Sequence, residues 1–158
     1  MTNAERLLRL FRDKDLTHPL FIADVVHELT AHRTANINEM TEDEVLTVIE
    51  GLETGAIDLQ AEYAHIVQLK EAKRAEIIAI AARTGFFPVS DANFDYFENW
   101  VKKGSPFEKS FWMHSNCELN ALYLKFTNIE RLFEEKAVEV GSPAWKIKQA
   151  RAQLTRND

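Results

Sequence analysis

Apolar residues recur at intervals of three and four along nearly the whole chain, and this repeat is that of one face of an α-helix. No segment alternates apolar and polar residues for long enough to indicate a strand, and the β-branched residues lie inside the three-and-four repeat. A chain of 158 residues has the length of one domain. The sequence therefore predicts an all-α fold, a single-domain helical bundle of about seven helices over residues 1–158.

Residues that favour helix ends divide this bundle. Capping boxes, in which a Ser or Thr hydroxyl and a Glu three residues later bond each other's backbone amides, are predicted at Thr41–Glu44, Ser105–Glu108 and Ser115–Glu118. Thr2 or Asn3 is expected to cap the first helix. The predicted helices span about 3–13, 20–32, 42–53, 57–83, 91–103, 106–140 with a break near His114, and 143–154.

The longest predicted helix covers about 57–83, because no Gly or Pro interrupts that segment. It would be about 40 Å long at 1.5 Å per residue. Its middle, Lys70–Glu76, is charged, so we expect it to be solvated or to form an oligomer contact. An oligomeric scaffold built on this helix, such as a homodimer, is therefore one candidate function. A seam in the domain is expected near 85–90, before a helix capped by Ser90 or Asp91.

Charge is unevenly distributed along the chain. The 25 acidic and 19 basic residues give a formal net charge of −6. Between Thr34 and Leu69 there is no Lys or Arg, whereas 141–157 contains four basic residues and no acid. The base-free segment holds eight acids: Glu39, Glu42, Asp43, Glu44, Glu50, Glu53, Asp58 and Glu62.

These eight acids form the predicted partner-binding site. A negative surface attracts cationic partners, and the net charge opposes direct binding to nucleic acid or to anionic membranes. The leading hypothesis is an interaction module that docks this surface on a basic partner protein, such as one that binds nucleic acid, and inhibits or regulates it. The alternative interpretation is that the acids complement helix dipoles and form a solvated face.

Motifs for common catalytic chemistries are missing from the sequence. There is no phosphate-binding Gly-rich loop, no dinucleotide-binding fingerprint and no G-x-S-x-G elbow. We therefore expect no cofactor and favour a function other than an enzyme. The single Cys117 excludes an intramolecular disulfide, and the N-terminus does not resemble a secretory signal. Since the longest apolar run is only Ile77–Ala82, we expect a cytoplasmic protein without a membrane span.

Two histidine patterns suggest metal binding. The segment from His27 to His32 begins His-Glu like a zinc-protease helix, but a spacing of five turns the second ring about 140° away on a helix, so we exclude that motif.

The second pattern consists of two carboxylate-x-x-His pairs, Asp24 with His27 and Glu62 with His65. Similar pairs supply ligands in helical di-metal proteins. A helical metal-binding protein or metalloenzyme is therefore a second alternative, although acids and histidines three apart are also common on helix surfaces.

Aromatic residues concentrate in the region 86–126, which holds eleven of the sixteen. Large aromatics at helical spacing are typical of a core, but they are also enriched in interfaces. Both interpretations stay open at this point. The eleven are Phe86, Phe87, Phe94, Tyr96, Phe97, Trp100, Phe107, Phe111, Trp112, Tyr123 and Phe126.

Overall fold

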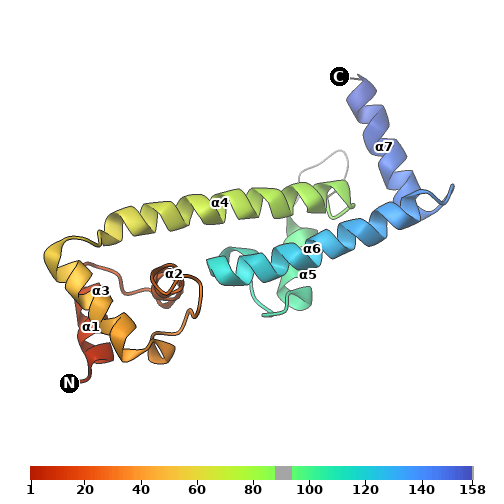
Figure 1. The fold of residues 1–158 in the computed structure, drawn as a ribbon. Helices are drawn as coiled ribbons and strands as arrows, with labels where there is room; N and C mark the ends of the chain where they lie inside the picture. Colours follow the sequence, from red (N-terminus) through yellow and green to blue (C-terminus); the bar gives the residue numbers. More distant parts are fainter. Residues whose placement is uncertain (88–93, 158) are drawn as a thin grey trace. The chain divides into compact units, whose positions relative to one another are not determined.

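The computed structural model describes residues 1–87 and 94–157. Within them it contains seven α-helices, two short 3-10 helices and no strand (Figure 1). The predicted all-α class and the long helix are therefore confirmed. The helices are α1 (Asn3–Asp13), α2 (Pro19–Leu29), α3 (Glu42–Thr54), α4 (Leu59–Arg83), α5 (Asp95–Gly104), α6 (Asn116–Ala137) and α7 (Pro143–Asn157).

Helix starts follow the capping chemistry at the first and third helices. The Thr2 and Thr41 hydroxyls each accept a hydrogen bond from the amide three residues on, and Glu5 and Glu44 complete the two capping boxes. Helix α4 begins later than expected, because the carboxylate of Asp58 accepts the amides of the first turn. The caps predicted for α5 at Ser90 and Asp91 lie outside the described residues.

The capping box predicted at Ser105–Glu108 does not start an α-helix. The Ser105 amide donates to the carbonyl of Val101 at the end of α5, so it is not available to the Glu108 carboxylate. Glu108 itself has a positive φ of 50°, which a helix cannot accommodate. The chain instead turns and forms only a short 3-10 helix at Phe111–Met113, before α6 begins.

Helix α2 ends three residues earlier than the predicted 20–32. Thr30 is its C-cap, and the following two residues, Ala31 and His32, have left-handed φ values of 51° and 68°. The amide of His32 donates to the carbonyl of His27, and that of Ala31 donates to Glu28. This is the paired hydrogen-bond pattern of a Schellman ending, formed here without the usual glycine.

Packing divides the chain into two compact units, 1–71 with 115–117, and 72–114 with 118–158. This division falls within α4. The seam expected near 85–90 lies partly outside the described residues and stays a prediction. Because α4 and α6 each contribute residues to both units, the grouping does not fix the number of domains, and the single-domain prediction stays a prediction.

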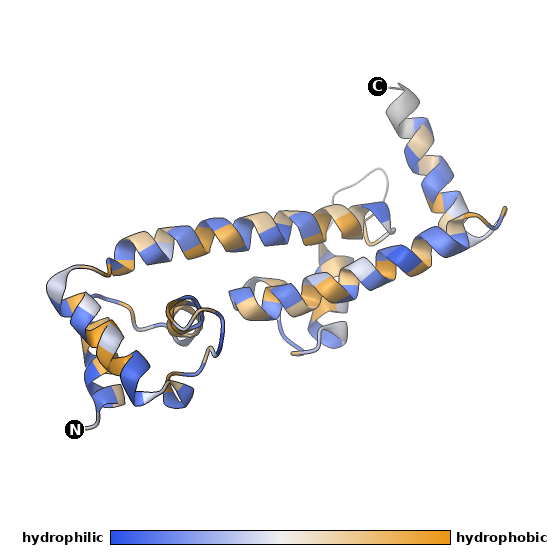
Figure 2. Cartoon of the chain, in the orientation of Figure 1, coloured by the Kyte–Doolittle hydropathy of each residue, from blue (hydrophilic) through white to orange (hydrophobic). Residues whose placement is uncertain are grey.

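The first unit has its own apolar core, which α1, α2, α3 and the start of α4 supply. Apolar residues lie on the inner sides of these helices, whereas α4 alternates polar and apolar turns (Figure 2). The largest wholly buried side chains in this core are Leu7, Phe11, Val25, Val26 and Ile66.

The second unit is built around aromatic rings. The Phe97 ring contacts Phe111 at 5.0 Å and Phe126 at 5.8 Å between centroids, and all three side chains are fully buried. Tyr96 and Trp112, by contrast, are more than half exposed. The aromatic region is therefore mainly core, with a minority of its rings on the surface. Among the described residues, no helix combines the length and apolar character needed to cross a membrane.

Replacing Ala31 with Gly is expected to stabilise the protein by about 1 kcal/mol, because glycine adopts the left-handed conformation without a Cβ penalty. Urea unfolding measures the change. As a control, Ala64→Gly in the exposed interior of α4 should destabilise by a similar amount. Destabilisation by Ala31→Gly would contradict the left-handed helix ending.

Candidate functional site

A buried ion pair fixes α2 within the first unit. The Asp24 carboxylate is 1% exposed and lies 3.0 Å from the ammonium nitrogen of Lys70, whose side chain is also buried. The second carboxylate oxygen of Asp24 accepts the backbone amide of Asn116 at 2.6 Å. Lys70 was expected among the solvated residues of the α4 middle, so that expectation is wrong at this position. Both charges are compensated, as buried charges must be.

Five of the eight predicted partner-binding acids form hydrogen bonds or ion pairs with other residues of the first unit. Glu44 pairs with Arg33, Glu53 lies 3.7 Å from Arg6, and Asp58 caps α4. The remaining two accept side-chain hydrogen bonds, Glu39 from Thr34 and Glu42 from Asn3.

The other three acids, Asp43, Glu50 and Glu62, make no side-chain hydrogen bond or ion pair with any described residue, and none is buried. Asp43 and Glu50 are seven residues apart on α3, so they share its outer face. Leu46 lies between them with 42% of its surface exposed. We name Asp43, Leu46 and Glu50 the α3 outer face.

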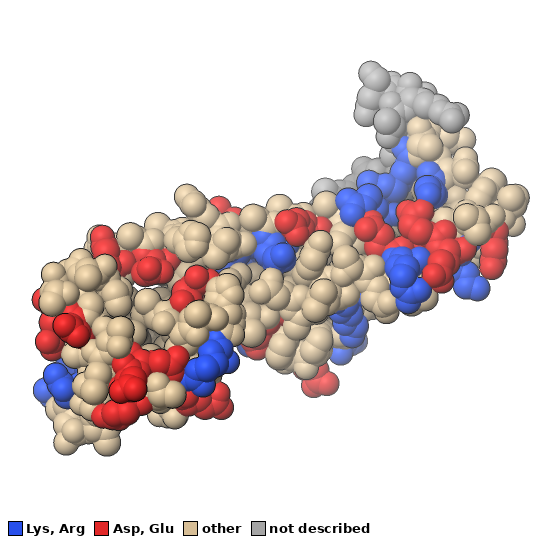
Figure 3. Space-filling model, in the orientation of Figure 1, with Lys and Arg blue, Asp and Glu red and all other residues tan. Residues whose placement is uncertain are grey.

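Charge separates strongly between the two units. The first has 14 acidic and 6 basic residues, a formal charge of −8, whereas the second has 11 acidic and 13 basic residues, a formal charge of +2. Figure 3 shows acidic side chains gathered over α1, α3 and the start of α4, with few basic ones among them. The negative charge of the protein is thus a property of the first unit.

Glu44 differs chemically from the other acids. Its hydrogen bonds with the Arg33 side chain and with the Thr41 backbone lower the pKa of its carboxyl from 4.5 to about 2. An acid that is held ionised by internal partners serves the fold, so we assign Glu44 a structural role.

The Glu44 pair generates a pH-dependent prediction. Because its pKa is lowered in the folded state, its stabilisation is complete above about pH 5 and is lost as the pH falls from 4.5 towards 2. Glu44→Gln should therefore be less stable than the wild type at pH 7, and the difference should vanish near pH 2. Thermal unfolding across this range measures it, and a difference that persists at pH 2 would contradict the assignment.

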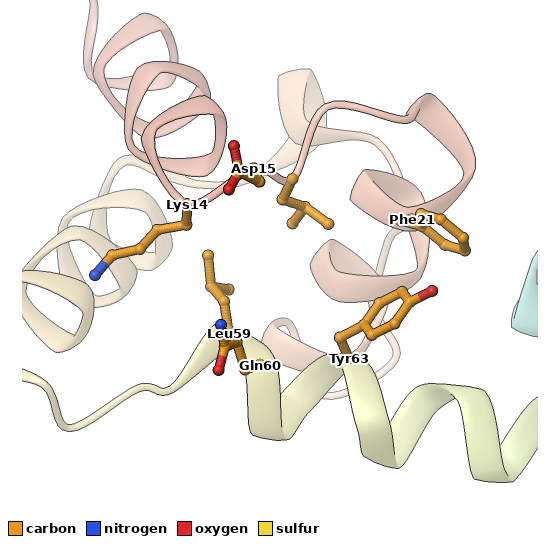
Figure 4. Close-up of a pocket in the computed structure, with 7 residues that line it drawn as sticks. Lys14, Asp15, Phe21, Leu59, Gln60 and Tyr63 are labelled. Carbon is orange, nitrogen blue, oxygen red and sulfur yellow. The ribbon is translucent and has the colours of Figure 1, made fainter.

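A cavity of about 260 Å³ opens beside the start of α4 (Figure 4). Phe21 and Tyr63 pack edge to face on one side, and Lys14 extends away from them. The residues that line the cavity include no pairing of a nucleophile with a base. Its lining therefore gives no support for catalysis.

The two carboxylate-x-x-His pairs are not joined into one site. Asp24 is occupied by Lys70 and Asn116, and His65 is exposed on α4. In the described part of the chain, the one group of three potential metal ligands that lie close together is His27, Glu28 and His32. It shares only His27 with the predicted pairs.

Sequence reasoning missed Lys70, although a signal was present. Lys70 follows Ile66 by four residues and precedes Ile77 by seven, so it occupies a position on the apolar stripe of α4. A lone base on such a stripe predicts a buried acid nearby, because an uncompensated buried charge is costly.

No protein-family model, curated protein or solved structure matches the chain.

Replacing Lys70 with Met is expected to cost about 3–5 kcal/mol of unfolding free energy, because it leaves the Asp24 carboxylate buried without its cation. Adding Asp24→Asn should recover part of this loss, since Asn keeps an oxygen for the Asn116 amide. Urea unfolding of the two single variants and the double variant measures the coupling. A cost below about 1 kcal/mol for Lys70→Met, as for a surface pair, would contradict the buried pair.

Proposed function

We propose that the protein is an interaction module whose first unit docks on a basic surface of a partner protein. The observation that carries the proposal is the set of acids without internal partners in a unit of formal charge −8. Asp43 and Glu62 lie in the first turns of α3 and α4, where they also complement the helix dipoles. Because no side chain of a described residue pairs with Asp43, Glu50 or Glu62, their charge is available to an external cation.

The α3 outer face supplies the contact chemistry. Asp43 and Glu50 present carboxylates to Lys or Arg side chains of the partner, and the exposed Leu46 between them supplies apolar contact. Glu62 adds a further carboxylate from α4. The other five acids of the predicted set contribute to the field and hold the first unit together.

The partner chemistry favoured by this surface is that of a nucleic-acid-binding protein. Such a protein presents Lys and Arg spaced to receive phosphates, and carboxylates can occupy the same positions. Docking there would block nucleic-acid binding, so the proposed outcome is inhibition or regulation. A cytoplasmic setting suits the exposed free thiol of Cys117, which persists under reducing conditions.

Neutralising the unpartnered acids tests the proposal. The triple variant Asp43→Asn, Glu50→Gln and Glu62→Gln should weaken binding to a partner captured at low salt by tenfold or more, and should flatten the salt dependence of its Kd. Calorimetry or surface plasmon resonance from about 50 to 300 mM salt measures both quantities.

A matched control distinguishes the effect of the acids of the first unit from the effect of a changed net charge. Glu76, Glu135 and Glu139 are exposed acids of the second unit, and their conversion to Gln changes the charge by the same amount. This control variant should retain the affinity. Equal losses in both triple variants, or no loss in the first, would refute the proposed docking surface.

A further inference from the structure

We propose that His27, Glu28 and His32 form a binding site for one divalent transition-metal ion, of the kind that zinc represents, at the C-terminal end of α2. This site is independent of the docking surface and uses none of the eight predicted partner-binding acids.

The end of α2 brings the two histidines together. On a continuous helix a spacing of five would separate the two rings. For that reason the spacing argues against a zinc-protease helix. Because the helix stops at Leu29 and the chain reverses through left-handed Ala31 and His32, the rings of His27 and His32 stack with 4.7 Å between their centroids and 1° between their planes. The rotation of about 140° calculated for a continuous helix therefore does not apply to His32, because α2 ends at Leu29.

Glu28 completes the group. Its Oε1 atom lies 3.0 Å from Nε2 of His32, and one potential ligand atom from each of the three residues lies within 4.8 Å of the others. Ligand atoms on a tetrahedral ion with bonds of about 2.1 Å are about 3.4 Å apart. Closing the site around an ion thus requires the ligand atoms to approach one another by up to about 1.4 Å. It also requires one imidazole ring to rotate out of the parallel stack, because the nitrogen lone pairs lie in the ring planes.

A buried histidine nitrogen without a hydrogen-bond partner supports the proposal of a bound ion. The side chain of His27 is more than nine-tenths buried, and its Nδ1 atom has no hydrogen-bond partner. A buried polar atom without a hydrogen-bond partner lowers the stability of the fold. A bound metal ion, or a water molecule on that ion, would give the Nδ1 atom a partner.

The donor set indicates the class of ion. Two imidazoles and one carboxylate are ligands typical of zinc, and three protein ligands leave a fourth position for water or an external group. His32 is exposed, so that position can be reached from solvent. An oxygen-preferring ion such as Mg²⁺ does not suit two imidazole ligands.

Metal titration of the full chain, purified without a histidine tag and stripped with chelator, tests the site. We expect calorimetry with Zn²⁺ to give one equivalent of saturable binding, and Co²⁺ to give the visible absorption of a four-coordinate complex. His32→Gln and Glu28→Gln should each weaken Zn²⁺ binding at least tenfold. Both residues lie at the helix end and His32 is exposed, so unfolding of these variants is not expected, and circular dichroism verifies it.

His65→Gln is the matched control, because His65 is also exposed but lies outside the cluster. It should leave the affinity unchanged. Failure to bind Zn²⁺ at about 10 μM, or binding that His32→Gln and Glu28→Gln leave intact, would overturn the proposal and reduce the cluster to a His–Glu ion pair at a helix end. Loss of partner binding in the acidic triple variant with Zn²⁺ binding intact would separate the two proposals.

Discussion

The buried carboxylate of Asp24 is the interaction on which the first unit depends. It neutralises Lys70 of α4 and accepts the amide of Asn116 at the start of α6, so residues distant in sequence are fixed to α2 by one side chain. A buried ion pair is weak evidence for added stability, but removing either partner is costly. The pair therefore links α2 to Lys70 of α4, and the same carboxylate links it to the start of α6. Helix α2 in turn carries His27 and Glu28, so the geometry of the proposed metal site depends on the same interaction.

Local chemistry made most of the fold predictable from the sequence. Thr41 begins α3 with the predicted capping box, and Thr2, one of the two caps expected for the first helix, begins α1 in the same way. The partners of each box lie three residues apart and need no tertiary contact. The errors arose where a competing hydrogen bond decided the outcome. At Ser105 the amide was already used by α5, and at Ala31 the helix closed with left-handed residues that are not glycine. Neither competition can be read from propensity or periodicity.

The candidate site was predictable in composition but not in detail. The base-free run of eight acids is visible in the sequence, whereas the distinction between structural Glu44 and unpartnered Glu50 depends on where Arg33 lies in space. The pairing of Asp24 with Lys70 spans 46 residues, and local spacing cannot anticipate it. The proximity of His27 and His32 was hidden for a related reason, because the ring rotation expected for a spacing of five assumes a helix that continues past Leu29.

In the proposed complex, carboxylates without internal partners on the first unit contact basic side chains of the partner. Zero-length carbodiimide cross-linking of the complex, with the linked residues identified by mass spectrometry, tests it most directly because it joins only carboxylates and amines already in contact. We expect cross-links from Asp43, Glu50 or Glu62 to partner lysines at low salt, and none at high salt. Cross-links confined to acids of the second unit, such as Glu135 and Glu139, would contradict it.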